Sequence, residues 1–198
     1  MESCRMVEER PPSPFIRIQS LLRTGPQAII YRFASQIFRI ISGYDVYRMS
    51  MVTPQLFVGG QHRPRGWAKM RLIGITAVVN MREPWHDDVK KGIGGERHLH
   101  LATRDNTPPA IEQLDEGVRF IADEIERGGK VYVHCGVGVG RAPTMAAAYL
   151  VSTGMTVDEA LDAIRKVRPF IHPTSKQIQR LHEYAAWLTQ HRSHREGV

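Results

Sequence analysis

Hydrophobic positions along the chain fall into short, dense runs separated by longer segments with helical spacing. The short runs, rich in β-branched and aromatic residues, predict strands over 44–51, 55–60, 75–80, 98–102 and 131–134. Apolar residues three and four apart predict helices over 64–72, 110–127, 141–153, 156–167 and 174–191. Thr156, with Glu159 three residues later, is a capping-box pattern. Strands that alternate with helices are typical of the α/β class, here with a central, mostly parallel sheet flanked by helices.

The strand over 131–134 leads into a glycine-rich loop that opens with Cys135 and closes with Arg141. Three glycines stand at alternate positions in it, Gly136, Gly138 and Gly140. In a strand–loop–helix of this kind the backbone N–H groups turn inward, and the helix N-terminus adds partial positive charge. The stretch therefore predicts an anion-binding loop with a sulfur nucleophile at its base.

The chemistry of the two end residues points to phosphate. A thiol attacks as its thiolate, which a nearby guanidinium and a helix N-terminus stabilise. The rigid fork of Arg141 suits two oxygens of a tetrahedral oxyanion, which a lysine ammonium would not match. A structural alternative is that Cys135 is only a small buried residue at a strand end. The cysteine and the arginine together favour the catalytic interpretation.

This pattern, His-Cys, five residues, then Arg, resembles the signature loop of the cysteine-dependent protein tyrosine and dual-specificity phosphatases. The resemblance extends from about Tyr44 to about Leu188 and implies a dual-specificity phosphatase-like fold without metal ion or cofactor. It implies that Cys135 forms a phospho-cysteine intermediate, that Arg141 binds the phosphate oxygens and that His134 helps to fix the loop. The implied phosphate-binding residues are Gly136, Val137, Gly138, Val139, Gly140 and Arg141.

One position departs from the family pattern. The family usually has serine or threonine after the arginine, where the hydroxyl assists departure of the thiolate, and this chain has Ala142. Some members of the family also carry alanine at this position. The departure therefore bears on the rate of the second chemical step and leaves the expected class of enzyme unchanged.

Dephosphorylation through a thiolate needs a proton donor for the leaving oxygen, which a carboxyl group on a loop facing the anion site can supply. Asp105 lies in the loop between the predicted strand over 98–102 and the predicted helix over 110–127. Its position about thirty residues before Cys135 is similar to that of the general acid in the dual-specificity group. We therefore expect Asp105 to be the general acid, against the alternative of a turn aspartate that caps the next segment. Weaker candidates are Asp87, Asp88 and Asp115.

Related chemistries fit the chain less well. Low-molecular-weight phosphatases and arsenate reductases place a similar loop near the N-terminus, and sulfur-transfer domains need no acid at this place. A metal site is not expected, because His98 and His100 have ligand-like spacing but no third ligand nearby. Arg82 and Trp85, which follow a strand, fit either the entrance of the site or an ordinary polar loop.

Composition sets the general class. With 198 residues, of which 42% are hydrophobic and 24% charged, the chain has the size and make-up of one globular domain. The formal net charge of +7 favours anionic partners, but no zinc-finger or RNA-binding signature is present, so we expect no nucleic-acid partner. Cys4 and Cys135 do not resemble a disulfide pair and suit a reducing, cytoplasmic compartment.

Two segments are predicted before the catalytic domain. Residues 1–14 contain three prolines and mixed charges, which is typical of a disordered tail. Residues 15–43 contain no acidic residue and form an amphipathic, basic helical segment, with two interpretations open. The helix lies in the interface of an anionic membrane, or its apolar face packs on the domain. The catalytic domain is expected over 44–190 and a polar tail over 191–198.

Phosphotyrosine and phosphoserine or phosphothreonine in proteins are the first expected substrates. Several stretches, however, look most like the branch of mitochondrial phosphatases that act on phosphatidylglycerophosphate, namely 100–105, 116–121, 131–135 and 144–150. A phospholipid head group, phosphatidylglycerophosphate or a phosphoinositide, is therefore an alternative, although Arg141 is the only cation in the loop, where that branch carries several. The glycine–valine loop also resembles that of phosphoglucan phosphatases. A phosphate-binding protein without activity is opposed by the intact cysteine, arginine and aspartate.

Overall fold

The fold is described from a computed structural model, which describes residues 37, 51–83, 94 and 97–196, with side chains as far as residue 191. The predicted tail over 1–14, almost all of the segment over 15–43, and positions 85, 87 and 88 lie outside the described residues. So does the predicted strand over 44–51, apart from Met51, which pairs with Phe57 in an isolated antiparallel bridge.

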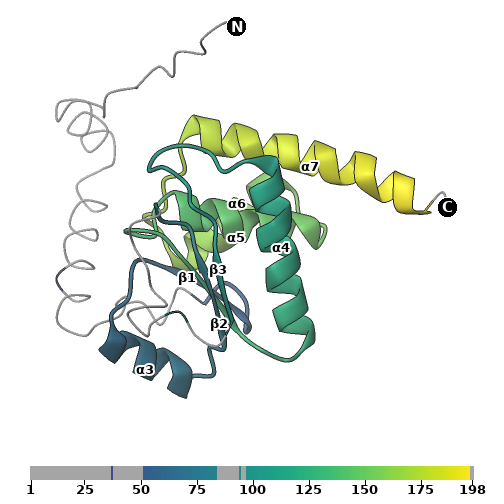
Figure 1. The fold of residues 1–198 in the computed structure, drawn as a ribbon. Coiled ribbons are helices and arrows are strands. Elements are labelled where there is room, and N and C mark those ends of the chain that lie inside the picture. The colour runs from purple at the N-terminus through teal and green to yellow at the C-terminus, as the bar shows by residue number, and fades with distance from the viewer. Residues whose placement is uncertain (1–36, 38–50, 84–93, 95–96, 197–198) are drawn as a thin grey trace, which may run out of the picture.

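The centre of the described fold is a four-stranded sheet in the order β1-β4-β2-β3, and all three pairings are parallel (Figure 1). The strands are β1 (Leu56–Gly59), β2 (Ala77–Asn80), β3 (Arg97–His100) and β4 (Val131–His134). Because the strands run in the same direction, their carboxyl ends and the loops that follow them gather at one edge. The predicted parallel sheet is confirmed.

One face of the sheet is covered by a layer of helices. These are α4 (Ile111–Glu126), α5 (Arg141–Ser152), α6 (Val157–Val167) and α7 (Ser175–Glu196). Leu56, Val79 and Val133 point into this layer and form the main core with residues such as Leu114 and Met145. α5 lies at the centre, where nearly all of its residues are buried. It is therefore the most firmly held helix of the fold.

The other face carries a smaller core under α3 (Pro64–Leu72) (Figure 1). Phe57, Val78 and Tyr132, the alternate residues of three strands, pack there against Trp67 and Met70. The faces of the sheet thus follow from the period of two in the strand sequences.

All five helices predicted within the described residues are present, and α3 has the predicted bounds. Two ends differ. α7 continues to Glu196, because the residues after position 191 include no glycine or proline before Gly197. β3 ends at His100, short of the predicted residue 102, because Leu101 makes the last backbone hydrogen bond to Asn80 before the chain turns away.

The predicted capping box at the start of α6 is confirmed. The Thr156 hydroxyl accepts a hydrogen bond from the Glu159 N–H at 3.3 Å, and the Glu159 carboxylate accepts one from the Thr156 N–H at 2.8 Å. Hydrogen bonds from the backbone and the hydroxyl of Thr156 hold the pKa of Glu159 below its ordinary value. None of the described helices is long and apolar enough to cross a membrane.

Candidate active site

The predicted anion-binding loop lies at the carboxyl edge of the sheet, between β4 and α5. Cys135 directly follows the central strand β4 and is only 3% exposed. Arg141 is the first residue of α5, and its side chain is buried as well. Both ends of the loop are therefore fixed by the most deeply packed strand and helix of the fold.

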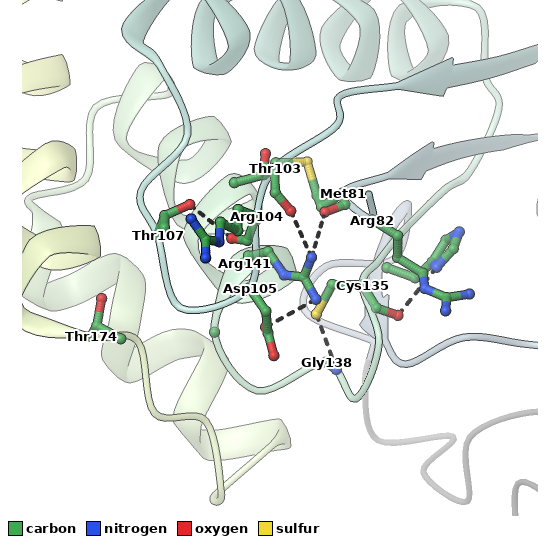
Figure 2. Close-up of polar contacts among 12 residues, drawn as sticks. Met81, Arg82, Thr103, Arg104, Asp105, Thr107, Cys135, Gly138, Arg141 and Thr174 are labelled. Carbon is green, nitrogen blue, oxygen red and sulfur yellow. Dashed lines mark hydrogen bonds and ion pairs between the residues drawn. The ribbon is translucent and has the colours of Figure 1, made fainter. Parts of the chain in front are cut away.

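Gly138 gives the loop its shape. It has a φ of +74°, a left-handed conformation that favours glycine, and its N–H donates to Cys135 Sγ at 3.2 Å (Figure 2). A Cβ at this position would lie 2.4 Å from the carbonyl carbon and 2.5 Å from the carbonyl oxygen of Gly59. Only glycine therefore lets the backbone approach β1 while its N–H points at the sulfur.

The carbonyl groups of the loop are held from outside. On the inside of the loop, the N–H of Gly138 donates to the sulfur of Cys135. The carbonyls of residues 136 to 140 accept, in order, from Gln61 N (3.1 Å), Arg168 Nη2 (2.9 Å), Arg168 Nε (2.7 Å), His172 N (2.8 Å) and Thr144 N (3.0 Å).

Arg168 is the main support behind the loop. It follows α6, is fully buried, and its guanidinium stacks over Phe170 at 4.5 Å. A buried guanidinium is costly unless it is well hydrogen-bonded, and Arg168 is satisfied in part by the carbonyls of Val137 and Gly138. In the sequence, the segment from Val167 to Pro173 resembles the family's turn behind the signature loop, but nothing there indicates the hydrogen bonds that Arg168 makes.

The guanidinium of Arg141 binds the segments that follow β2 and β3 through Nη1, which leaves Nε and Nη2 for other partners. Its Nη1 donates to the carbonyls of Met81, at 3.2 Å, and Thr103, at 2.7 Å (Figure 2). Its Nη2 pairs with Asp105 Oδ1 at 3.0 Å, and its buried Nε has no hydrogen-bond partner among the described residues. Nε and Nη2 form the edge that suits two phosphate oxygens.

Asp105, which the sequence analysis expects to be the general acid, lies within ion-pair distance of the arginine of the loop. Its side chain remains 63% exposed, so solvent screens the ion pair and an incoming anion can compete for Nη2. Asn106, the next residue, has a φ of 62°, which asparagine tolerates better than most residues and which forms the tight turn after Asp105. Asp115, the other candidate that falls within the described residues, pairs with Arg119 on α4.

The loop that carries Asp105 is fastened to α7. Gln177, which is 1% exposed, donates from Nε2 to the carbonyl of Thr107 at 2.9 Å and accepts at Oε1 from the N–H of Thr174. Arg180 Nη1 donates to the carbonyl of Pro109 at 2.7 Å. These contacts hold the loop after Asp105, and Arg141 holds it before Asp105 through the carbonyl of Thr103. Gln177 was not predicted from the sequence, where no motif marks it.

His134 supports the loop from within the sheet. It is fully buried, and its Nδ1 lies 3.4 Å from the carbonyl oxygen of Cys135. Its ring stacks on Tyr132 at 5.8 Å between centroids and meets His62 edge-on at 5.1 Å. The side chain therefore packs behind the cysteine.

Arg82 follows β2, and Figure 2 draws it among the residues of the site. Its Nη1 donates to Gln61 Oε1 at 2.5 Å, and its carbonyl lies 2.8 Å from His100 Nε2. His98 and His100 are both on β3, and the described residues contain no group of three side chains suited to a metal ion. Arg82 thus joins the loops after β1 and β2 at the edge of the site.

The model of the dual specificity phosphatase catalytic domain matches residues 56–186, which contain all described elements except the end of α7. The chain belongs to the dual specificity phosphatase family. The matched residues include the loop from Cys135 to Arg141.

The chain is also similar to individual relatives and to solved structures within this family. The chain is 29% identical over 178 residues to the phosphatidylglycerophosphate phosphatase PTPMT1 of Arabidopsis thaliana, covering 83% of this chain and 53% of the relative. It is 37% identical over 114 residues to the phosphatidylglycerophosphatase and protein-tyrosine phosphatase 1 of Homo sapiens, covering 57% of this chain and 54% of the relative. This chain thus spans about half the length of these curated relatives. The crystal structure of PTPMT1 in complex with PI(5)P has a TM-score of 0.66 and 25% identity, covering 71% of this chain and 96% of that chain.

We expect Gly138→Ala to lower kcat/KM for an aryl phosphate by about 100-fold, because the added Cβ pushes the loop off Gly59 and misplaces the amides. Gly136→Ala is the matched control, because its Cβ would lie 3.6 Å from Arg141 Nη2, an ordinary contact distance. We expect this variant to lower kcat/KM by about tenfold at most. Steady-state kinetics on both variants, with thermal unfolding as a check on folding, measures the difference. Equal losses in the two variants would contradict this account of the loop.

Proposed function

We propose that the protein is a cysteine-dependent phosphomonoester hydrolase of the dual-specificity type, acting on phosphotyrosine and phosphoserine or phosphothreonine. The observation that carries the proposal is the ion pair of Arg141 with Asp105, beside the loop whose Gly138 N–H donates to Cys135 Sγ. In this proposal Cys135 is the nucleophile, Arg141 binds the phosphate and Asp105 is the general acid. Family membership supports the reaction type.

The first step follows from these positions. A phosphate dianion binds to the loop amides and to Nε and Nη2 of Arg141, and it displaces the Asp105 carboxylate from Nη2. The released Asp105 carboxylate takes up a proton from solvent and enters the step as the carboxylic acid. The Cys135 thiolate forms the sulfur–phosphorus bond as the bond from phosphorus to the leaving oxygen breaks, and that oxygen takes the proton of Asp105.

The second step regenerates the thiolate. A water molecule gives its proton to the Asp105 carboxylate and attacks phosphorus, the sulfur–phosphorus bond breaks, and inorganic phosphate leaves. Ala142 is fully buried and offers no hydroxyl to the departing sulfur, while the nearby Thr144 hydroxyl donates to the carbonyl of Gly140 at 2.9 Å. We therefore expect the second step to be slow relative to the first.

A phospholipid head group is the second candidate substrate. The names of the Arabidopsis and human relatives specify phosphatidylglycerophosphate, and PTPMT1 has been solved in complex with PI(5)P. Arg141 is the only basic side chain of the loop from Cys135 to Arg141, which suits one phosphomonoester group and demands no second phosphate. The site chemistry proposed above is the same for both substrate classes.

The residues named in the mechanism are tested by Cys135→Ser and Asp105→Asn. We expect Cys135→Ser to abolish turnover of aryl phosphates, phosphopeptides and phosphatidylglycerophosphate alike, because all three need the thiolate. We expect Asp105→Asn to lower kcat by about 100-fold or more for phosphoserine, whose leaving oxygen is basic, and much less for an activated aryl phosphate.

Asp115→Asn is the matched control, because that carboxylate pairs with Arg119 on α4 and lies outside the proposed machinery. It should leave kcat unchanged on every substrate. Wild-type turnover in the Cys135→Ser protein, or an Asp105→Asn effect independent of the leaving group, would overturn the assigned roles.

Residues 15–44 are proposed to contact an anionic membrane, on the sequence pattern alone: four arginines, no acidic residue and abundant isoleucine and phenylalanine. The full chain should co-sediment with phosphatidylglycerol vesicles better than a chain that starts near Tyr44. Identical co-sedimentation of the two proteins would instead support packing of this segment on the domain.

A further inference from the structure

The exposed surface of α3 is basic and apolar, without the acidic residues that a typical solvated helix also carries. Gly66, Trp67 and Met70 are buried, and the outward residues include two arginines, a lysine and a leucine. We call this surface the α3 face; its outward side carries Arg65, Lys69 and Leu72, Arg71 lies on one flank, and Arg63 and Ile73 stand just before and just after the helix.

Leu72 lies within the α3 face rather than at its margin. Arg65 and Leu72 are seven residues apart, two turns along the same side of the helix, and Lys69 lies between them. Leu72 is 86% exposed and Ile73 is 50% exposed, so two large apolar side chains project from a basic surface. The Lys130 ammonium, which donates to the carbonyl of Ile73 at 2.9 Å, adds a further cation at this end.

The charge of this region has one sign. The chain from Met51 to Arg82 contains no aspartate or glutamate, although it includes β1, α3 and β2. Basic side chains around an exposed leucine–isoleucine pair favour a partner that offers negative charge and, just beneath it, an apolar phase. An acidic protein surface supplies the charge but not the apolar layer.

We propose that the α3 face docks on the surface of an anionic lipid bilayer, with Leu72 and Ile73 inserted among the acyl chains near the head groups. The other end of α3 is close to the candidate site, because Gln61, two residues before Arg63, donates its N–H to the carbonyl of Gly136. A helix lying in the interface therefore holds the edge of the phosphate loop near the level of the lipid head groups. This docking is separate from that of residues 15–44.

The test measures partition of the full chain onto phosphatidylcholine vesicles with and without phosphatidylglycerol. All proteins carry Cys135→Ser, so binding is measured without catalysis and its outcome does not depend on the proposed function. We expect Arg65→Gln with Arg71→Gln to weaken partition onto the anionic vesicles about tenfold. The matched control, Arg165→Gln with Lys166→Gln on the exposed side of α6, removes the same charge and should change it less than about twofold.

Insertion of the apolar pair is tested in the same assay. Leu72→Ser with Ile73→Ser should weaken partition several-fold, whereas Met155→Ser, at a residue 40% exposed after α5, should not. A polarity-sensitive dye attached at Leu72→Cys, in a protein that also carries Cys4→Ser, should shift to the blue on anionic vesicles only. The same dye at Met155→Cys should not shift.

Three results would overturn the docking proposal. They are equal losses for the α3 and α6 charge variants, no dye shift at position 72, and binding that depends only on residues 15–44 and is unaffected by changes in the α3 face. Thermal unfolding at unchanged temperature confirms that each variant remains folded.

Discussion

The site depends on the direction in which five consecutive carbonyl groups point. Those of residues 136 to 140 all accept hydrogen bonds from outside the loop, two of them from the buried guanidinium of Arg168. Within the loop, the N–H of Gly138 donates to Cys135 Sγ. An anion site made of backbone amides is thus produced by donors that never touch the anion.

These donors come from different parts of the chain, so the shape of the loop depends on the packing of the whole domain. Gln61 follows β1, Arg168 follows α6, His172 precedes α7, and Thr144 lies in α5. On the opposite side, Arg141 joins the end of β2 to the loop that carries Asp105. The parallel sheet matters for function because it brings these loops to a single edge.

The sequence predicted what local chemistry determines. The strand–loop–helix around Cys135, the helix at 64–72 and the capping box of Thr156 and Glu159 follow from residue types at fixed spacings. The place of Asp105 near Arg141 was expected from the resemblance to the dual-specificity group. The supporting contacts of Arg168 and Gln177 did not follow, because each depends on a side chain reaching a carbonyl thirty or more residues away in sequence. No periodicity or motif encodes such a contact.

The arginine of the loop has two anionic partners in the proposed cycle. Its Nη2 is paired with the exposed carboxylate of Asp105, an interaction weakened by solvent, and its buried Nε has no hydrogen-bond partner among the residues described. A bound phosphate dianion would use both nitrogens and release the carboxylate for proton transfer. The same ion pair thus explains why Asp105 lies beside the site and why a phosphate that binds Nη2 releases its side chain.

Direct detection of phosphate on Cys135 tests the central claim. Acid-quenching the wild-type protein during turnover of a phosphomonoester, followed by peptide mass spectrometry, reports any covalent intermediate. The account predicts one phosphoryl group on the peptide that contains Cys135, accumulating because Ala142 supplies no hydroxyl for the second step, and absent from the Cys135→Ser protein. Turnover with no phosphorylated Cys135 peptide at any quench time, or with phosphate on another residue, would contradict it.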